Sequence, residues 1–123
     1  MELYKSAYFG KWAAEHNISD ATMRTAIREM HQGVFEASLG GCVYKKRIAI
    51  GNKGKSAGSR TIIAFKQHER AFFIYGFTKN ARANISKNEL AALKKLAKIY
   101  LNLPAQDLQR EVQKGQLIPI LEE

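Results

Sequence analysis

Basic side chains that could act on a phosphate are concentrated in the middle of the sequence. From Ala37 to Asn88 the chain carries eleven Lys or Arg residues and one acid, Glu69, whereas the remaining residues carry nine basic and ten acidic side chains. The net charge of +9 therefore arises in this stretch. Because like charges crowded on a folded surface repel each other, the pattern favours a polyanionic partner, with nucleic acid first, an anionic membrane second and an acidic protein third.

Strand alternation would bring several of these cations together. Apolar side chains alternate with Lys45 and Arg47, so that these two cations share one face of a predicted strand. Arg60 begins the next predicted strand, while Lys79 and Arg82 follow a third one. If the three strands are neighbours, these five side chains, together with Lys53 and Lys55 of the glycine loop between the first two strands, form a cationic concavity that holds a bent phosphate backbone. The spacing alone equally allows ordinary surface cations around a sheet.

Cations of this kind suit one particular reaction, the cleavage of RNA. That reaction requires activation of a 2′-hydroxyl, stabilisation of negative charge on the phosphorane and protonation of the leaving 5′-oxygen. Fixed positive charge supplies the second requirement strongly. A lysine acts as a base only where burial or neighbouring cations lower its pKa, whereas an arginine is a poor base and a better phosphate clamp.

Other site chemistries have little support. His16, His31 and His68 all lie outside the basic cluster, and paired carboxylates for a metal-dependent nuclease are scarce in the middle segment. The glycines of residues 51–56 lack the spacing and the following helix of a nucleotide-binding loop. Cys42 is the single cysteine, so it forms no internal disulfide and has no second cysteine for a zinc site. We therefore expect neither a metal nor a cofactor.

The periodicity predicts the elements that carry these residues. Ser19 is placed to cap a helix, and the Ser86–Glu89 segment fits a capping box. The order of elements predicts an α+β domain that spans residues 1–123. The expected helices cover Ala7–His16, a segment from about Ser19 to Gly33, a segment after Ser86 and a shorter one from Pro104 to about Gly115; the expected strands cover Cys42–Ile50, Arg60–Lys66 and Ala71–Phe77, with a possible short strand at Leu3–Lys5 and an extended tail at Leu117–Leu121.

The expected cellular location follows from the lack of a membrane-spanning run and of a signal peptide in the sequence. No apolar run approaches the roughly 18 residues needed to cross a bilayer. The first residues have no apolar signal-peptide core and carry an acid, Glu2. We therefore expect a cytoplasmic protein without membrane attachment.

Three stretches together resemble the RelE/HigB branch of bacterial type II toxins. The distinctive pieces are a pair of glycines before the first strand, a Gly-Lys-Ser-x-Gly-x-Arg loop and a Lys-Asn-x-Arg-x-Asn-Ile segment after the third strand. These pieces lie in Gly40–Arg47, Gly54–Ile63 and Phe73–Ile85. The placement of the predicted helices agrees as well, so the resemblance covers nearly the whole chain.

This resemblance implies a fold and an activity. The expected fold is that of microbial ribonucleases and RelE-like toxins, with two N-terminal helices packed on a twisted antiparallel sheet of three to four strands, followed by C-terminal helices. The expected activity is metal-independent cleavage of mRNA, usually in the ribosomal A site, which inhibits translation. The implied partners are mRNA, the ribosome and a cognate antitoxin, expected to be a helix-turn-helix DNA-binding protein that covers or distorts the basic face.

The resemblance also assigns residues. In this hypothesis Arg60 and Arg47 clamp the phosphate, Lys45 or Lys55 influences the 2′-hydroxyl, and Lys79 or Arg82 stabilises the leaving side. Several relatives place a tyrosine or histidine late in the domain as an acid–base or stacking group, where this chain offers Tyr100 within a predicted helix. The expected catalytic residues are Lys45, Arg47, Lys55, Arg60, Lys79 and Arg82, and the expected RNA-binding residues are Lys46, Lys53, Asn80 and Asn84.

Two other functions remain open at this point. ParE-like relatives poison DNA gyrase without cutting RNA, although gyrase binding does not require such a cationic constellation. A non-catalytic nucleic-acid-binding domain would use aromatic residues such as Tyr44 and Tyr75 to stack bases, but the core of the predicted strands accounts for most of these aromatics.

Overall fold

A mixed β-sheet of six strands forms the centre of the molecule. A computed structural model describes residues 1–50 and 58–121. The sheet order is β2-β3-β4-β5-β1-β6, in which β1 pairs parallel with β5 and the other neighbours pair antiparallel. The elements are β1 (Glu2–Ser6), α1 (Ala7–Glu15), α2 (Asp20–His31), β2 (Ala37–Gly40), β3 (Val43–Ile48), β4 (Ser59–Lys66), β5 (Arg70–Thr78), α3 (Lys87–Leu101), α4 (Ala105–Gln113) and β6 (Leu117–Pro119).

The sheet corrects the predicted fold. An antiparallel sheet of three to four strands carrying two N-terminal helices is wrong, because the sheet has six strands and is mixed. The difference comes from short strands. β1 forms at the position of the possible strand and inserts parallel to β5, β2 adds an edge before β3, and β6 pairs with β1 at the other edge. The pairings of β1 with β5 and with β6 join segments far apart in the chain, which leave no local periodicity in the sequence, and β2 has only four residues.

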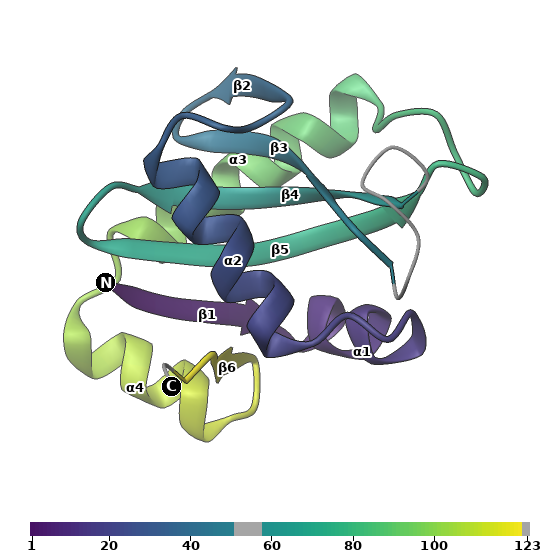
Figure 1. Ribbon diagram of the computed structural model, residues 1–123. Coiled ribbons are helices and arrows are strands. Elements are labelled where there is room, and N and C mark those ends of the chain that lie inside the picture. Colours follow the sequence, from purple (N-terminus) through teal and green to yellow (C-terminus); the bar gives the residue numbers. More distant parts are fainter. Residues whose placement is uncertain (51–57, 122–123) are drawn as a thin grey trace.

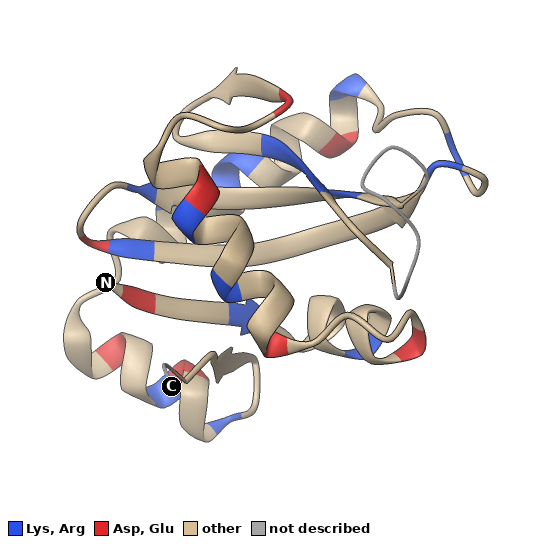
Figure 2. Ribbon diagram, viewed as in Figure 1, with Lys and Arg blue, Asp and Glu red and all other residues tan. Residues whose placement is uncertain are grey.

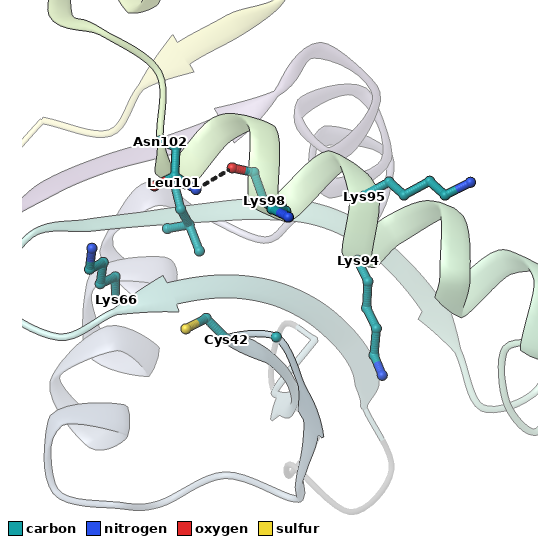
Figure 3. Close-up of a pocket in the computed structure, with 8 residues that line it drawn as sticks. Cys42, Lys66, Lys94, Lys95, Lys98, Leu101 and Asn102 are labelled. Atoms are coloured by element: carbon teal, nitrogen blue, oxygen red, sulfur yellow. Dashed lines mark hydrogen bonds between the residues drawn. The ribbon is translucent and has the colours of Figure 1, made fainter.

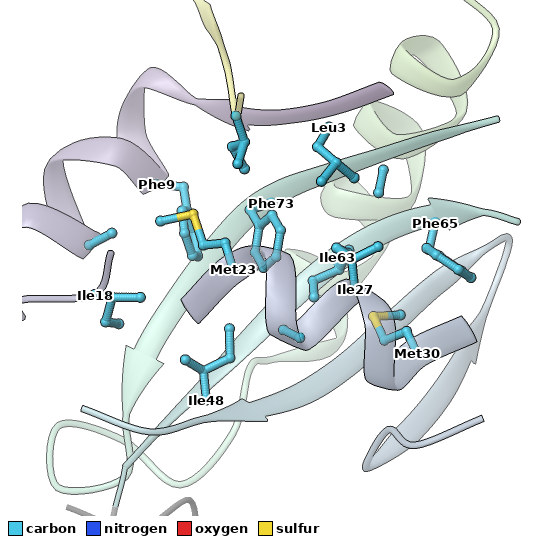
Figure 4. Packing of buried hydrophobic residues seen from close by; sticks show 14 residues of the cluster. Leu3, Phe9, Ile18, Met23, Ile27, Met30, Ile48, Ile63, Phe65 and Phe73 are labelled. Carbon is cyan, nitrogen blue, oxygen red and sulfur yellow. The ribbon is translucent and has the colours of Figure 1, made fainter. Parts of the chain in front are cut away.

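Helices cover both faces of the sheet. Figure 1 shows α2 crossing in front of the strands and α3 lying behind them. We call the side of α1 and α2 the front face and the side of α3 the back face. On the front face Phe9 and Met23 pack with Ile63 and Phe73 in an apolar core (Figure 4). This core fixes the sheet against α1 and α2 and leaves the back face to α3.

The back face is apolar only over part of its area. Val43, Ile62 and Phe72 are buried there together with Tyr100 and Leu101 of α3.

The α3 helix begins with the predicted capping box, in which Ser86 accepts a hydrogen bond from the Glu89 backbone N–H while the Glu89 side chain accepts one from the Ser86 backbone N–H. The side chain of Ser19 caps α2, also as predicted.

Two features near the C-terminal end agree with the sequence. Pro104 precedes α4, and Pro119 ends β6, which is the last strand at one edge of the sheet.

In the part of the chain that the structure describes, none of the helices combines the length and the apolar character needed to span a bilayer.

Candidate functional site

Two rows of side chains cross β3, β4 and β5 on the back face. Direct cross-strand partners point to the same side of a sheet. Arg47 pairs with Arg60, and Arg60 pairs with Phe77, which forms the first row. In the second row Lys45 pairs with Ile62, and Ile62 pairs with Tyr75 in the same register as the first row; a bulge shifts the register only beyond Ile62. Three cations from two adjacent strands therefore lie next to one another.

The carboxylate of Glu36 holds these three cations together. Its Oε1 accepts hydrogen bonds from Arg47 Nε at 2.8 Å and from Arg60 Nε at 2.9 Å. Its Oε2 lies 3.5 Å from Lys45 Nζ. Glu36 itself is fixed by its backbone N–H, which donates to the Lys45 carbonyl at 2.8 Å just before β2 begins. We call Glu36, Lys45, Arg47 and Arg60 the Glu36 cluster.

The Glu36 cluster is only partly exposed to solvent. The Arg60 side chain is 9% exposed, whereas that of Arg47 is 46% exposed. Among the described residues, Arg60 Nη1 and Glu36 Oε2 are buried without a hydrogen-bond partner. Burial raises the pKa of the Glu36 carboxyl, but the hydrogen bond from Arg47 and the charges of Arg60, Lys45 and Arg47 outweigh burial, so the net pKa is lowered. Glu36 is therefore an anion at neutral pH.

A second cluster lies beside the first row and joins β5 to α3. The guanidinium of Arg82 binds both carboxylate oxygens of Glu89, with 2.7 Å between Nη1 and Oε2. The same Nη1 donates to the Tyr75 hydroxyl at 3.1 Å, and the guanidinium carbon lies 5.9 Å from the centre of the Phe77 ring. We call Tyr75, Arg82 and Glu89 the Glu89 cluster. Phe77, opposite Arg60 in the sheet, connects the two clusters.

Glu89 has two functions in this arrangement. Its carboxylate completes the N-terminal cap of α3 and at the same time binds Arg82. Hydrogen bonds from Arg82 and from the Ser86 backbone lower the Glu89 pKa to about 2. The hydrogen bond to Glu89 is also the main reason that the Arg82 pKa is raised. The start of α3 thus fixes the position of a cation that the sequence placed in an irregular segment.

The remaining predicted site residues occupy different places. Lys46 is 2% exposed on the front face, where its Nζ lies 2.8 Å from Glu29 Oε1, so it does not join the other cations. Lys79 and Asn80 are exposed in the turn after β5. Asn84 is exposed as well, and its carbonyl accepts from Arg82 Nε at 2.9 Å. The predicted residues Lys53 and Lys55 lie outside the described residues.

The excess charge of the middle segment is partly compensated in the fold by acids from elsewhere. Glu2, Glu29, Glu36 and Glu89 lie outside the stretch from Ala37 to Asn88, yet each forms an ion pair with a cation inside it. Figure 2 shows basic segments on β3, at the start of β4 and after β5, at the same end of the sheet. Among the described residues of the stretch from Ala37 to Asn88, the cations that lie within 4 Å of an acid are Lys45, Lys46, Arg47, Arg60, Lys66, Arg70 and Arg82.

Sequence reasoning missed three members of the site. Glu36 lies one residue before the basic stretch and belongs to no motif, so nothing marked it as the partner of three cations. From the sequence, Tyr75 is either a base-stacking residue or part of a strand core, and its pairing with Ile62 places it on the back face beside the cations. Glu89 was predicted as a helix cap, and its second bond, to Arg82, depends on tertiary structure. Tyr100, by contrast, is buried against Phe72.

The site contains four cations, two carboxylates and the Tyr75 hydroxyl; the cations are Lys45, Arg47, Arg60 and Arg82, and the carboxylates are those of Glu36 and Glu89. Among the described residues, no group of three or more His, Cys, Asp or Glu side chains is arranged to hold a metal ion. The chemistry that the geometry supports is the binding of an anion and the stabilisation of additional negative charge on it.

Comparison with known proteins identifies a family that the chain matches. A family model described as the RelE toxin of the RelE/RelB toxin-antitoxin system matches residues 1–120. This match extends over every strand and helix from β1 to β6. A search of curated proteins found no match.

Proposed function

Since the chain belongs to the RelE toxin family of toxin–antitoxin systems, we propose that it is an endoribonuclease that cuts mRNA on the ribosome, without a metal ion, and so inhibits translation. Membership in the family gives it an antitoxin as a partner. We further propose that this antitoxin is of the helix-turn-helix type, that residues 1–123 form one toxin domain, and that the protein acts in the cytoplasm without a cofactor.

The observation that carries this proposal is the convergence of Lys45, Arg47 and Arg60 on one carboxylate. All three cations reach a single anionic group, with nitrogen–oxygen distances of 2.8 to 3.5 Å. The two non-bridging oxygens of a phosphodiester resemble a carboxylate in charge and in hydrogen-bonding capacity, and arginines bind both groups through parallel hydrogen bonds. The cluster is therefore already assembled around an anion before substrate arrives.

In the proposed reaction the first row of side chains binds the scissile phosphate. Arg60 is held by burial beside Glu36, while the more exposed Arg47 approaches the phosphate from the solvent side. As the phosphorane forms, the additional negative charge is stabilised by these two guanidinium groups. Lys45, in the second row, lies next to them and acts on the 2′-hydroxyl. Arg82, with Lys79 in the same segment, stabilises the leaving oxygen.

Two groups of the site are proposed to transfer protons during cleavage, one from the substrate and one to it. Glu36 is ionised and contacts Lys45, so it can accept the proton of the 2′-hydroxyl. The Tyr75 hydroxyl lies at the β5 end of the second row, where it accepts a hydrogen bond from Arg82, and it can donate its own proton to the leaving 5′-oxygen. This division assigns the acceptor to the β3 end of the rows and the donor to the β5 end.

The proposal is tested by inducing expression in bacteria and mapping the 5′ ends of cellular mRNA after a short pulse. We expect growth arrest and new mRNA ends that depend on translation, with both effects removed by Arg60→Ala and by Lys45→Ala. The matched control, Lys11→Ala, changes an exposed lysine of α1 and should remain toxic. Arrest that persists in both site variants contradicts the assigned site. Intact mRNA together with reduced DNA supercoiling would instead identify a ParE-like gyrase poison.

A further inference from the structure

A lysine-lined groove lies on the back face, away from the two clusters. Figure 3 shows it between α3 and the turn that joins β2 to β3, with Lys94 and Lys98 on one side and Cys42 on the other. The groove has a volume of about 430 Å³. Its lining residues are Gly41, Cys42, Lys66, Lys94, Lys95, Lys98, Leu101 and Asn102.

The charges along the groove are of one sign. Among the described residues that line it, none is acidic. Lys94 and Lys98 are four residues apart on α3, a spacing at which like charges repel and destabilise a helix. The Lys94 ammonium reaches across toward the β2–β3 turn, since a Cβ built on Gly40 would lie 3.3 Å from Lys94 Nζ. An anionic ligand in the groove would remove this repulsion.

The groove continues the candidate site along the same strand. Val43 is buried under α3, and Lys45 and Arg47 follow it at alternate positions on the back face of β3. From Cys42 at the groove to Arg47 in the Glu36 cluster the strand advances by roughly 17 Å at its usual rise per residue. Cations therefore follow the back face from the proposed scissile phosphate to Lys66, at the far end of β4.

We propose that this groove binds the phosphate backbone of the RNA strand that flanks the scissile phosphate. The inference rests on the proposed function for the identity of the substrate, and it assigns Lys66, Lys94 and Lys98 as backbone contacts outside the reacting centre. Such contacts are independent of base sequence and release counterions when they form. The apolar floor at Leu101 and the alkyl parts of the lysines leave the ammonium groups at the rim, where phosphates can reach them.

The test measures how salt affects binding of short and long RNA. The probes are a fluorescent trinucleotide, which occupies the site alone, and a dodecamer, which also reaches the groove, both 2′-O-methylated to prevent cleavage. The groove variant is the triple change Lys66→Gln, Lys94→Gln and Lys98→Gln. The matched control, Lys11→Gln with Arg110→Gln and Lys114→Gln, removes the same charge from α1, from α4 and from the residue that follows α4. Circular dichroism verifies folding, and Lys94→Gln alone provides a milder variant.

We expect the groove variant to lower the salt slope of dodecamer binding by about 2, because each lost phosphate contact on a single strand removes about 0.7. Between 50 and 200 mM salt the dodecamer affinity of the wild type should then fall about twentyfold more than that of the groove variant. Trinucleotide binding should stay within twofold, and the control variant should bind both probes like the wild type. Lys94→Gln should shift the slope in the same direction by about 0.7.

Three results would overturn the inference: no measurable binding of the dodecamer at low salt, an equal effect of the groove and control variants, or an equal loss for trinucleotide and dodecamer. The proposed function fails separately. If Arg60→Ala leaves trinucleotide binding unchanged while the dodecamer still depends on the lysines, the groove binds RNA but the assigned cleavage site is wrong. If the groove variant binds RNA normally and loses affinity for the antitoxin, the groove belongs to the protein partner.

Discussion

Arg47 and Arg60 lie directly opposite each other on β3 and β4, and both donate their Nε hydrogens to the same oxygen of Glu36, at 2.8 and 2.9 Å. Two guanidinium groups in neighbouring positions repel each other unless an anion lies between them. Glu36 supplies that anion in the free protein. A substrate phosphate would have to share these cations with Glu36 or replace it, so this contact couples the stability of the site to the binding of its ligand.

Glu36→Gln should therefore destabilise the fold and increase its response to anions. Loss of the shared carboxylate leaves three cations without their common partner, and we expect the free energy of unfolding to fall by about 2 kcal/mol, less than for a fully buried pair because the cluster is partly exposed. Added sulfate should raise the melting temperature of this variant more than that of the wild type, since it binds only the folded state. Equal responses to sulfate would show that Glu36 does not occupy the anion position.

Arg60→Lys should keep the fold and lose most of the activity. Lysine retains the charge but lacks the planar guanidinium that bridges Glu36 and, in our proposal, the phosphate. We expect cleavage of ribosome-bound mRNA to slow by about a hundredfold, comparable to the loss of one oxyanion donor in other enzymes. Arg110→Lys, on exposed α4, is the matched control and should cleave like the wild type. Full activity of Arg60→Lys would exclude a bidentate function for Arg60.

Stability in acid should depend on Glu89. Hydrogen bonds from Arg82 and Ser86 lower its pKa in the folded protein to about 2, compared with 4.5 for an unperturbed glutamate. A carboxyl whose pKa is lower in the folded state binds more protons when unfolded, so its contribution is fully present above pH 4.5 and is lost as the pH falls toward 2.

Urea denaturation at a series of pH values measures this effect. The wild type should lose more stability than Glu89→Gln between pH 4.5 and 2. Glu111→Gln on α4 removes a carboxyl that takes no part in the cluster, and it should keep the wild-type dependence in this window. If Glu89→Gln and the wild type lose stability in parallel, the bond between Arg82 and Glu89 does not persist in solution.

Gly76→Ala should destabilise the contact between α1 and β5. A Cβ at this position would lie 2.3 Å from a ring carbon of Trp12, and the ring is held between Phe9 and His16 at centroid distances of 5.4 and 5.0 Å. We expect overpacking to cost about 2 kcal/mol. Fluorescence of Trp12, the single tryptophan, reports unfolding directly.

Gly33→Ala serves as the control for Gly76→Ala. Gly33 has a φ of +80° with open space around it, so alanine there meets no neighbour and bears only the cost of a left-handed backbone, about 1 kcal/mol. A smaller loss for Gly76→Ala than for Gly33→Ala would mean that Trp12 can move away from the strand.

Local patterns in the sequence predicted the elements around the site. Alternation on β3 placed Lys45 and Arg47 on one face, and short connections placed Arg60 on the neighbouring strand, as their pairing shows. The Ser86–Glu89 capping box predicted the start of α3. These predictions succeeded because strand alternation and helix capping depend on residues only a few positions apart. The catalytic functions of the cations stay a prediction.

Features that depend on distant residues were not predictable in the same way. Lys46 sits between two cations in the sequence, but alternation turns it to the front face, where Glu29 of α2 neutralises it. Charge counting along the chain could not reveal this pairing, because Glu29 lies outside the basic stretch. Likewise, no local pattern in the sequence predicts that β1 pairs in parallel with β5, which begins more than sixty residues later.

The sequence by itself determined which cations this protein has, where its strands alternate and where its helices begin, because each of these properties is local. Tertiary structure alone decided that Glu36 binds Lys45, Arg47 and Arg60, and that Glu89 and Tyr75 hold Arg82 beside them. The physical reason is that an ion pair depends on distance in space, and only the packing of β3, β4, β5 and α3 brings these groups within reach of one another.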